Sequence, residues 1–186
     1  MQRTVFTLNL PGMPIYMTWG SVIAYAILVA ALFGVMTIVE DVPAGEALIG
    51  ALVGLALHLL ACTLHQAGHA VAAQRTGYPM QGWRTYWLFG TSLYPADEGN
   101  LPAAVHIQRA LGGQIFSLPL TLIAIIVAII VLPAEGMARV LTVFFLIDAL
   151  TFSPGAFIPL PLIMETDGNT LLRWWPKRRL SASQNV

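Results

Sequence analysis

Three long apolar stretches constrain most strongly how this chain can fold. Residues 21–39 and 113–132 carry no charge, and residues 44–64 carry one, Glu46, near their start. A helix needs about 20 predominantly apolar residues to cross the hydrocarbon core of a bilayer. Only 10% of the 186 residues are charged, whereas a soluble domain carries about 25%. The sequence therefore predicts a multi-pass membrane protein.

A fourth apolar stretch, residues 137–162, is less regular than the other three. It contains Asp148 and then Pro154, Gly155, Pro159 and Pro161. Proline removes a helical hydrogen bond, so we expect this stretch to begin as a helix and then to kink or unwind. Irregular backbone at membrane depth is tolerated only where protein or a watery cavity surrounds it. The interruption predicts a site near the end of this span, where Pro159 and Pro161 open the backbone.

Together these stretches predict an all-α membrane protein with about four transmembrane helices. We divide the chain into an N-terminal cytoplasmic or interfacial segment (1–19), a membrane domain (20–175) and a basic cytoplasmic tail (176–186). Eight of the nine Lys and Arg residues fall on one side of this four-span arrangement. Cytoplasmic loops are enriched in these residues, so both termini are predicted to be cytoplasmic. The net charge of zero gives no reason to expect a nucleic-acid partner.

The polar connection between the second and third spans, residues 76–109, is too rich in Pro and Gly to cross a membrane. Its aromatic residues alternate loosely with polar ones, which predicts short strands or an interfacial β-hairpin. Two interpretations remain open. The rings anchor the loop at the lipid headgroups, or a sheet edge in this loop pairs with a peptide.

Two histidines stand at the end of the second span, in the segment L-H-Q-A-G-H-A-V. His65 and His69 are four residues apart, so on a helix their rings share one face. Two imidazoles at this spacing can bind one zinc ion. Gly68 between them leaves room for a close approach. The spacing alone is weak evidence for a metal site.

A carboxylate beyond the fourth span supplies a candidate third ligand. Asp167 lies in the segment E-T-D-G, and the predicted topology returns it to the same side of the membrane as the two histidines. Two His and one carboxylate leave a fourth zinc position open for water, as hydrolytic zinc sites require. The sequence therefore predicts a zinc site made by His65, His69 and Asp167.

Two further ionisable residues lie inside the predicted spans. His58 is seven residues before His65 and about 10 Å from it along the helix, at 1.5 Å per residue. It is either a hydrogen-bonded core histidine or a fourth metal ligand. Asp148 either bonds helix ends or waters inside the bundle, or contributes to the metal or substrate site. Charged groups in membrane spans are costly, so both residues are candidates for a functional role.

These motifs resemble the site-2 protease family of intramembrane zinc metalloproteases. The family signature is H-E-x-x-H on one membrane helix and a distant D-G, which correspond here to H-Q-A-G-H and T-D-G. The segment R-A-L-G-G-Q-I-F-S-L is similar to the Gly-rich start of the next core helix. The resemblance covers residues 55–172. It implies a zinc-dependent peptidase fold that acts on membrane-protein segments within the lipid bilayer.

Gln66 departs from the family pattern, because the family carries its catalytic Glu at this position. An amide cannot accept the proton of the attacking water, and the loss of a general base typically lowers the rate by about 10²- to 10⁴-fold. Three explanations are open: a natural member that binds without cutting, a deliberately inactivated protein, or a substitute carboxylate. Glu165 is the best substitute.

Three function classes follow. The first is an intramembrane zinc peptidase, silent or impaired because of Gln66. The second is a pseudoprotease that binds membrane segments without cutting them. The third is a small transporter or channel component that uses intramembrane His and Asp residues as a relay.

Overall fold

The computed structural model describes residues 3–10, 12–96, 101–160 and 165–177. Its elements in chain order are β1 (Thr4–Leu8), β2 (Ile15–Thr18), α1 (Trp19–Gly34), a π-helical turn (Val35–Val39), α2 (Ala44–Arg75), β3 (Gly82–Tyr86), β4 (Phe89–Leu93), α3 (Ala103–Val131), α4 (Gly136–Phe152), a 3-10 turn (Pro154–Phe157) and α5 (Asp167–Trp174).

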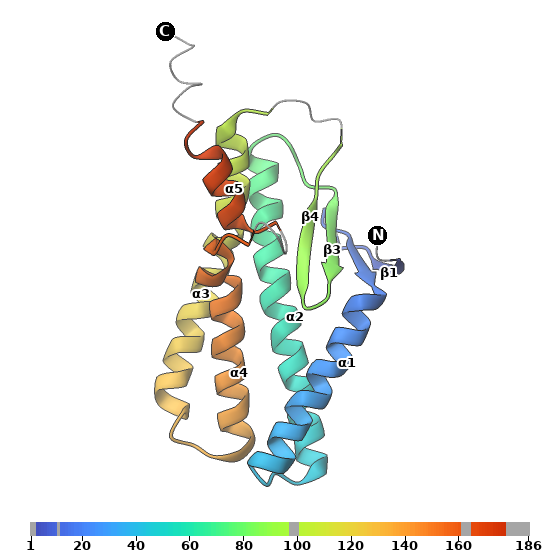
Figure 1. Ribbon diagram of the computed structural model, residues 1–186, viewed down its shortest axis with the longest axis vertical. Helices are drawn as coiled ribbons and strands as arrows, with labels where there is room; N and C mark the ends of the chain where they lie inside the picture. The colour runs from blue at the N-terminus through green and yellow to red at the C-terminus, as the bar shows by residue number, and fades with distance from the viewer. Residues whose placement is uncertain (1–2, 11, 97–100, 161–164, 178–186) are drawn as a thin grey trace.

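Among the described residues, four helical segments are long and apolar enough to cross a membrane: Trp19–Val39, Ala44–Arg75, Ala103–Val131 and Gly136–Phe157. They confirm the four predicted spans and run along the long axis of the molecule (Figure 1). The predicted change of backbone within the fourth stretch is also present, because α4 ends at Phe152 and a 3-10 turn follows.

Two boundaries differ from the prediction. The helix α2 continues to Arg75 rather than ending near residue 64, and α3 begins at Ala103, ten residues before the predicted start. Bilayer thickness limits only the apolar part of a helix, so both helices extend beyond their uncharged windows. The connection between them is correspondingly shorter, and Arg109 and His106 lie on α3 rather than in a loop.

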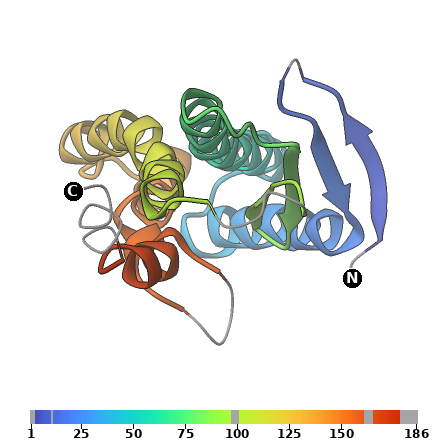
Figure 2. The same cartoon turned by 90° about the horizontal axis from the view of Figure 1, so that it is seen from above.

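The predicted hairpin is present as β3 and β4, and the N-terminal segment extends it. The four strands form one sheet in the order β1-β2-β3-β4, in which β2 pairs parallel to β3 through Ile15 and Trp83. Thr18, the N-cap of α1, donates its backbone N–H to the Thr85 hydroxyl (2.9 Å) and its own hydroxyl to the Thr85 carbonyl (3.0 Å). These bonds fix the sheet against the start of α1. Figure 2 shows β1 at the outer side of the molecule, far from α3, α4 and α5.

Helices α2 and α3 cross at glycines. A side-chain Cβ on Gly68 would collide with the Gly112 carbonyl, and one on Gly112 would lie 2.5 Å from the Gly68 carbonyl oxygen. Small residues let membrane helices approach this closely, where packing and not the hydrophobic effect holds them together. The room that Gly68 leaves is therefore occupied by the backbone of α3.

We expect Gly68→Ala to destabilise the protein by about 3 kcal/mol, the upper range for overpacking, because the new methyl group meets rigid backbone. Gly45→Ala in the same helix is the matched control, since a Cβ there meets nothing within 4 Å. Thermal unfolding in detergent micelles should show a lower Tm for the first variant only. Equal Tm values for both variants would contradict the close crossing.

An ion pair closes the end of the bundle opposite the sheet. The Glu40 carboxylate accepts hydrogen bonds from Arg139 Nε (2.9 Å), from Arg139 Nη2 (2.7 Å) and from the backbone N–H of Gly136 (2.9 Å). It thereby joins the α1–α2 connection to the start of α4. The hydrogen bonds from Arg139, followed by that from Gly136, lower the pKa of Glu40 despite its desolvation.

This pairing predicts a stability that depends on pH. Because the folded-state pKa of Glu40 is depressed, the stabilisation is complete above the ordinary Glu value of about 4.3. It is lost as the pH falls through the lower folded-state pKa. The Tm of the wild-type protein should therefore exceed that of Glu40→Gln at pH 7, and the two should converge at acidic pH. A Tm difference that stays constant with pH would argue against this role.

Candidate metal centre

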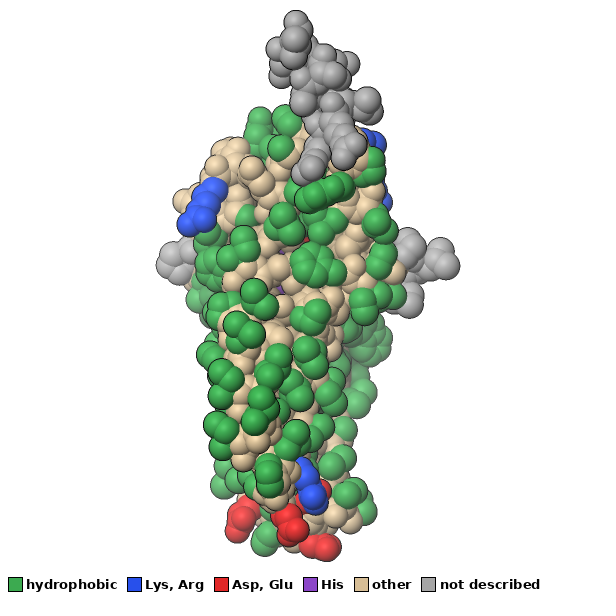
Figure 3. Space-filling view, turned by 90° about the vertical axis from the view of Figure 1, so that its left-hand side faces the viewer, with side chains coloured by type: hydrophobic (Ala, Val, Ile, Leu, Met, Phe, Trp, Pro, Cys, Tyr) green, Lys and Arg blue, Asp and Glu red, His purple; other side chains and the backbone are tan. Residues whose placement is uncertain are grey.

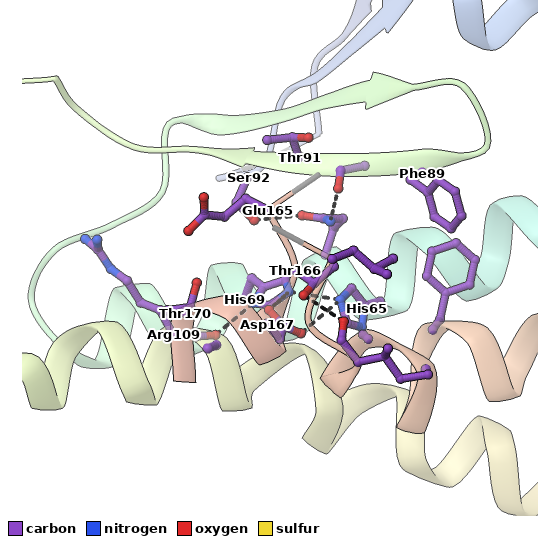
Figure 4. Close-up of a pocket in the computed structure, with 18 of the residues that line it drawn as sticks. His65, His69, Phe89, Thr91, Ser92, Arg109, Glu165, Thr166, Asp167 and Thr170 are labelled. Carbon is purple, nitrogen blue, oxygen red and sulfur yellow. Dashed lines mark hydrogen bonds and ion pairs between the residues drawn. The ribbon is translucent and has the colours of Figure 1, made fainter. Parts of the chain in front are cut away.

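Three side chains converge at one point between α2 and α5. His65 Nε2 and His69 Nε2 are 3.0 Å apart on successive turns of α2. Asp167, the first residue of α5, places Oδ2 3.5 Å from His65 Nε2 and Oδ1 3.4 Å from His69 Nε2. Figure 4 shows the three side chains pointing toward one another. They form a group whose nitrogen and oxygen atoms are close enough to hold one metal ion.

The Nδ1 atoms of both histidines already have hydrogen-bond partners. His69 Nδ1 lies 2.8 Å from the Arg109 carbonyl oxygen, which can only accept, so Nδ1 carries the proton. His65 Nδ1 lies 2.9 Å from the Ser117 hydroxyl, and that hydroxyl donates to the Gly113 carbonyl (2.6 Å). Ser117 therefore accepts from His65 Nδ1. In the neutral rings both Nε2 atoms are then unprotonated, and their lone pairs face each other.

This arrangement fits a cation. Two unprotonated nitrogens 3.0 Å apart cannot hydrogen-bond each other, but they can share a metal ion. Zinc bonds of about 2.0–2.1 Å in tetrahedral geometry separate the donor atoms by roughly 3.3 Å. The three separations here, 3.0, 3.4 and 3.5 Å, lie around that value. Imidazole and carboxylate are also ligand types that zinc accepts.

Asp167 is held in place from two sides. Gln114 of α3 donates from Nε2 to Asp167 Oδ2 (3.1 Å). Thr166 is the N-cap of α5 and accepts from the Asn169 N–H (3.3 Å). A Cβ on Gly168 would collide with the Phe157 carbonyl, so only glycine permits this approach. Burial raises the pKa of Asp167, while nearby His69 and Gln114 oppose the shift.

A glycine on α3 gives the two imidazoles their space. A Cβ on Gly113 would lie 2.5 Å from His69 Nε2 and 2.6 Å from His65 Cε1. The Gly-rich segment that suggested a family helix therefore forms one wall of the site. The sequence analysis singled out this segment, but it did not predict that Gln114, Ser117 and the Arg109 carbonyl support the three converging side chains. Their spacing along a helix is the signal that could have indicated a shared face.

A cavity of about 880 Å³ opens beside the converging side chains. His65, Gln66, His69 and Asp167 lie on its wall, and residues of β4, α3, α4, α5 and the α4–α5 connection complete it. Leu150 and Phe152 of α4 contribute apolar side chains to its lining. On the β4 side, Thr91 and Ser92 contribute polar side chains and Phe89 an apolar one (Figure 4).

Gln66 is buried, with 3% of its surface exposed, and it bonds to β4 rather than to the converging side chains. Its Nε2 donates to the Gly90 carbonyl (3.2 Å), and its Oε1 accepts from the Ser92 hydroxyl (2.9 Å). A carbonyl only accepts, so the group facing Gly90 must be a donor. An amide meets this requirement and an ionised carboxylate does not.

The remaining predicted residues lie farther from the centre. His58 Nδ1 is 2.9 Å from Asp148 Oδ1, so these two pair with each other. Glu165 lines the cavity, is 55% exposed and forms an ion pair with Arg173 (3.2 Å). Pro159 borders a small apolar groove beside α5. Pro161 lies outside the described residues.

Comparisons with known proteins agree with this geometry at the level of the fold. No protein-family model matches the sequence, and no curated protein matches it significantly. Among solved structures, the chain is similar to the Site-2 Protease from Methanocaldococcus jannaschii, with a TM-score of 0.60 and 17% sequence identity. The similarity covers 94% of this chain and 72% of that one. With its four apolar helices and small sheet, the chain is an integral membrane protein with the fold of a site-2 protease.

Proposed function

We propose that this chain is a site-2-protease-like intramembrane zinc peptidase in which Gln66 suppresses hydrolysis. The convergence of His65 Nε2, His69 Nε2 and Asp167 on the wall of the 880 Å³ cavity carries this proposal. The three residues hold zinc, while Ser117, Gln114 and the Arg109 carbonyl keep their donor atoms directed at it. Outer partners of this kind fix the tautomer and orientation of ligating side chains. Bound zinc supplies Lewis-acid chemistry and lowers the pKa of water to about 7.

The cavity and the adjacent strand favour an extended peptide as the ligand. The backbone carbonyl of Leu93 in β4 accepts a hydrogen bond from the backbone N–H of Gln81, which precedes β3, so the Leu93 carbonyl points toward β3. Backbone groups of an antiparallel strand alternate in direction, so those of Gly90 and Ser92 point away from β3. These residues also line the cavity. The Gly90 carbonyl already accepts from Gln66. A membrane segment that unwinds there can therefore pair with β4 beside that bond and place apolar side chains against Leu150 and Phe152, as in strand addition.

Gln66 limits the chemistry at this site. General-base catalysis needs a group that accepts a proton within hydrogen-bond reach, and an amide does not accept one. Glu165 lines the same cavity, but it is paired with Arg173 and more than half exposed. Slow hydrolysis is the expected behaviour of the chain as it stands.

A specific contact favours the second candidate, a pseudoprotease that captures membrane segments without cutting them. The Gln66 amide uses both its donor and its acceptor on β4. The surroundings of position 66 therefore match glutamine, as expected if the residue belongs to the native protein and has a structural role.

The charge distribution supports a cytoplasmic location for the site. Arg75, Arg109, Arg173 and Lys177 belong to the end of the bundle that carries α5, whereas acidic side chains gather at the opposite end (Figure 3). Cytoplasmic segments are enriched in basic residues. This polarity agrees with cytoplasmic termini.

Metal analysis and cross-linking test the proposal. The purified chain should contain about one zinc ion, and a photoreactive group at Thr91 should cross-link to a single-span peptide in liposomes. The matched control places the same group at Ile23, an exposed residue of α1. A chain without zinc, or equal cross-linking at both positions, would exclude a zinc peptidase site at this cavity.

A further inference from the structure

A second polar cluster lies inside the helix bundle, about two helical turns along α2 from the metal centre. His58 of α2 and Asp148 of α4 are 2% and 8% exposed, and they bond at 2.9 Å. Tyr25 of α1 packs edge-on against the His58 ring, with centroids 5.7 Å apart. Three of the four candidate spans therefore meet at this cluster.

The hydrogen bond between His58 and Asp148 is the one that these two side chains make among the described residues. The other polar atoms of the cluster, His58 Nε2, Asp148 Oδ2 and the Tyr25 hydroxyl, are buried without a hydrogen-bond partner in that part of the chain. Buried charged and polar groups are stable only when they are paired, and ionisable residues in membrane spans usually have a function. Because this bond joins α2 to α4, it fixes where α4 sits along α2.

Phe152 connects this cluster to the metal centre. It lies one helical turn beyond Asp148 and is the last residue of α4. Its ring centroid is 5.7 Å from that of His58, 5.9 Å from that of His65 and 6.1 Å from that of Phe89. A shift of α4 along α2 would therefore move Phe152 against the His65 imidazole.

From this geometry we infer that His58 and Asp148 are positioning residues for the metal centre. Their hydrogen bond sets the position of Phe152, and the Phe152 ring holds the His65 imidazole in the orientation that binds zinc. Neither residue contacts the metal-binding atoms, so the effect passes through packing. The inference rests on the proposed zinc site and adds two residues from outside it.

Zinc titration of the full chain in detergent micelles, against a chromophoric chelator, tests the inference. Asp148→Leu and Phe152→Leu should each weaken zinc binding about tenfold, the lower end of the 10- to 100-fold effect of outer-shell residues. Asp148→Asn keeps an oxygen that accepts from His58, so its affinity should stay within about threefold of wild type. Val143→Ala, on the exposed face of α4, is the control and should bind zinc as the wild type does.

A double variant separates positioning from general stability. His58→Leu with Asp148→Leu removes both polar groups, and apolar replacement of a buried pair typically preserves stability. Its Tm should approach that of the wild type while zinc binding stays about tenfold weaker, at the lower end of the outer-shell range. Recovery of affinity together with Tm would overturn the inference, as would equal losses for Asp148→Asn and Asp148→Leu. A wild-type chain that binds no zinc would instead refute the proposed function.

Discussion

Replacing Gln66 with Glu should raise the rate at which the protein hydrolyses a membrane-protein substrate by about 10²- to 10⁴-fold, the usual contribution of general acid–base catalysis. A carboxylate at this position accepts the proton that the amide cannot. The substitution also changes the contact with β4, because the amide donates to the Gly90 carbonyl at 3.2 Å. An ionised carboxylate is repelled from that carbonyl, turns toward the cavity and leaves Gly90 available to a peptide.

Reconstitution into liposomes with a single-span reporter, followed by gel analysis of cleavage, measures this gain. Gln66→Ala is the control, since it removes the contact with β4 without supplying a base, and it should show no gain. Cleavage by the wild-type chain at the rate of the Glu variant would show that Gln66 does not limit hydrolysis. Cleavage by neither would favour the pseudoprotease that only captures membrane segments.

The second large effect concerns the third ligand. Asp167→Ala should weaken zinc binding by more than about 100-fold, because residues that only support ligands already contribute 10- to 100-fold. Asp167 lies within 3.5 Å of both histidine Nε2 atoms and is the sole carboxylate in this group among the described residues. Zinc content after dialysis and competition titration provide the measurement.

Glu165→Ala is a close control for this experiment. Glu165 is a carboxylate two residues away, but it is exposed and paired with Arg173. Zinc affinity in this variant should equal that of the wild type. Comparable losses at positions 165 and 167 would mean that general negative charge, rather than coordination by Asp167, attracts the ion.

The sequence by itself determined the features that depend on local pattern. Apolar length predicted the four spans, because bilayer thickness sets the length of a spanning helix. Proline predicted the break after α4, and the spacing of His65 and His69 placed both rings on one helix face. Each of these inferences uses residues that lie close together in the chain.

The tertiary structure decided what depends on distant segments. Asp167 reaches the histidines because α5 packs against α3, where Gln114 bonds to Asp167 and Gly113 leaves room for the two imidazoles. The N-terminal strands were missed, because β2 pairs with β3 across 68 residues between Ile15 and Trp83. Likewise, the sequence shows only that Gln66 replaces the catalytic Glu of the family pattern. The tertiary structure adds that the Gln66 amide forms hydrogen bonds with β4. Pairing between distant segments depends on packing in space, which no local periodicity encodes.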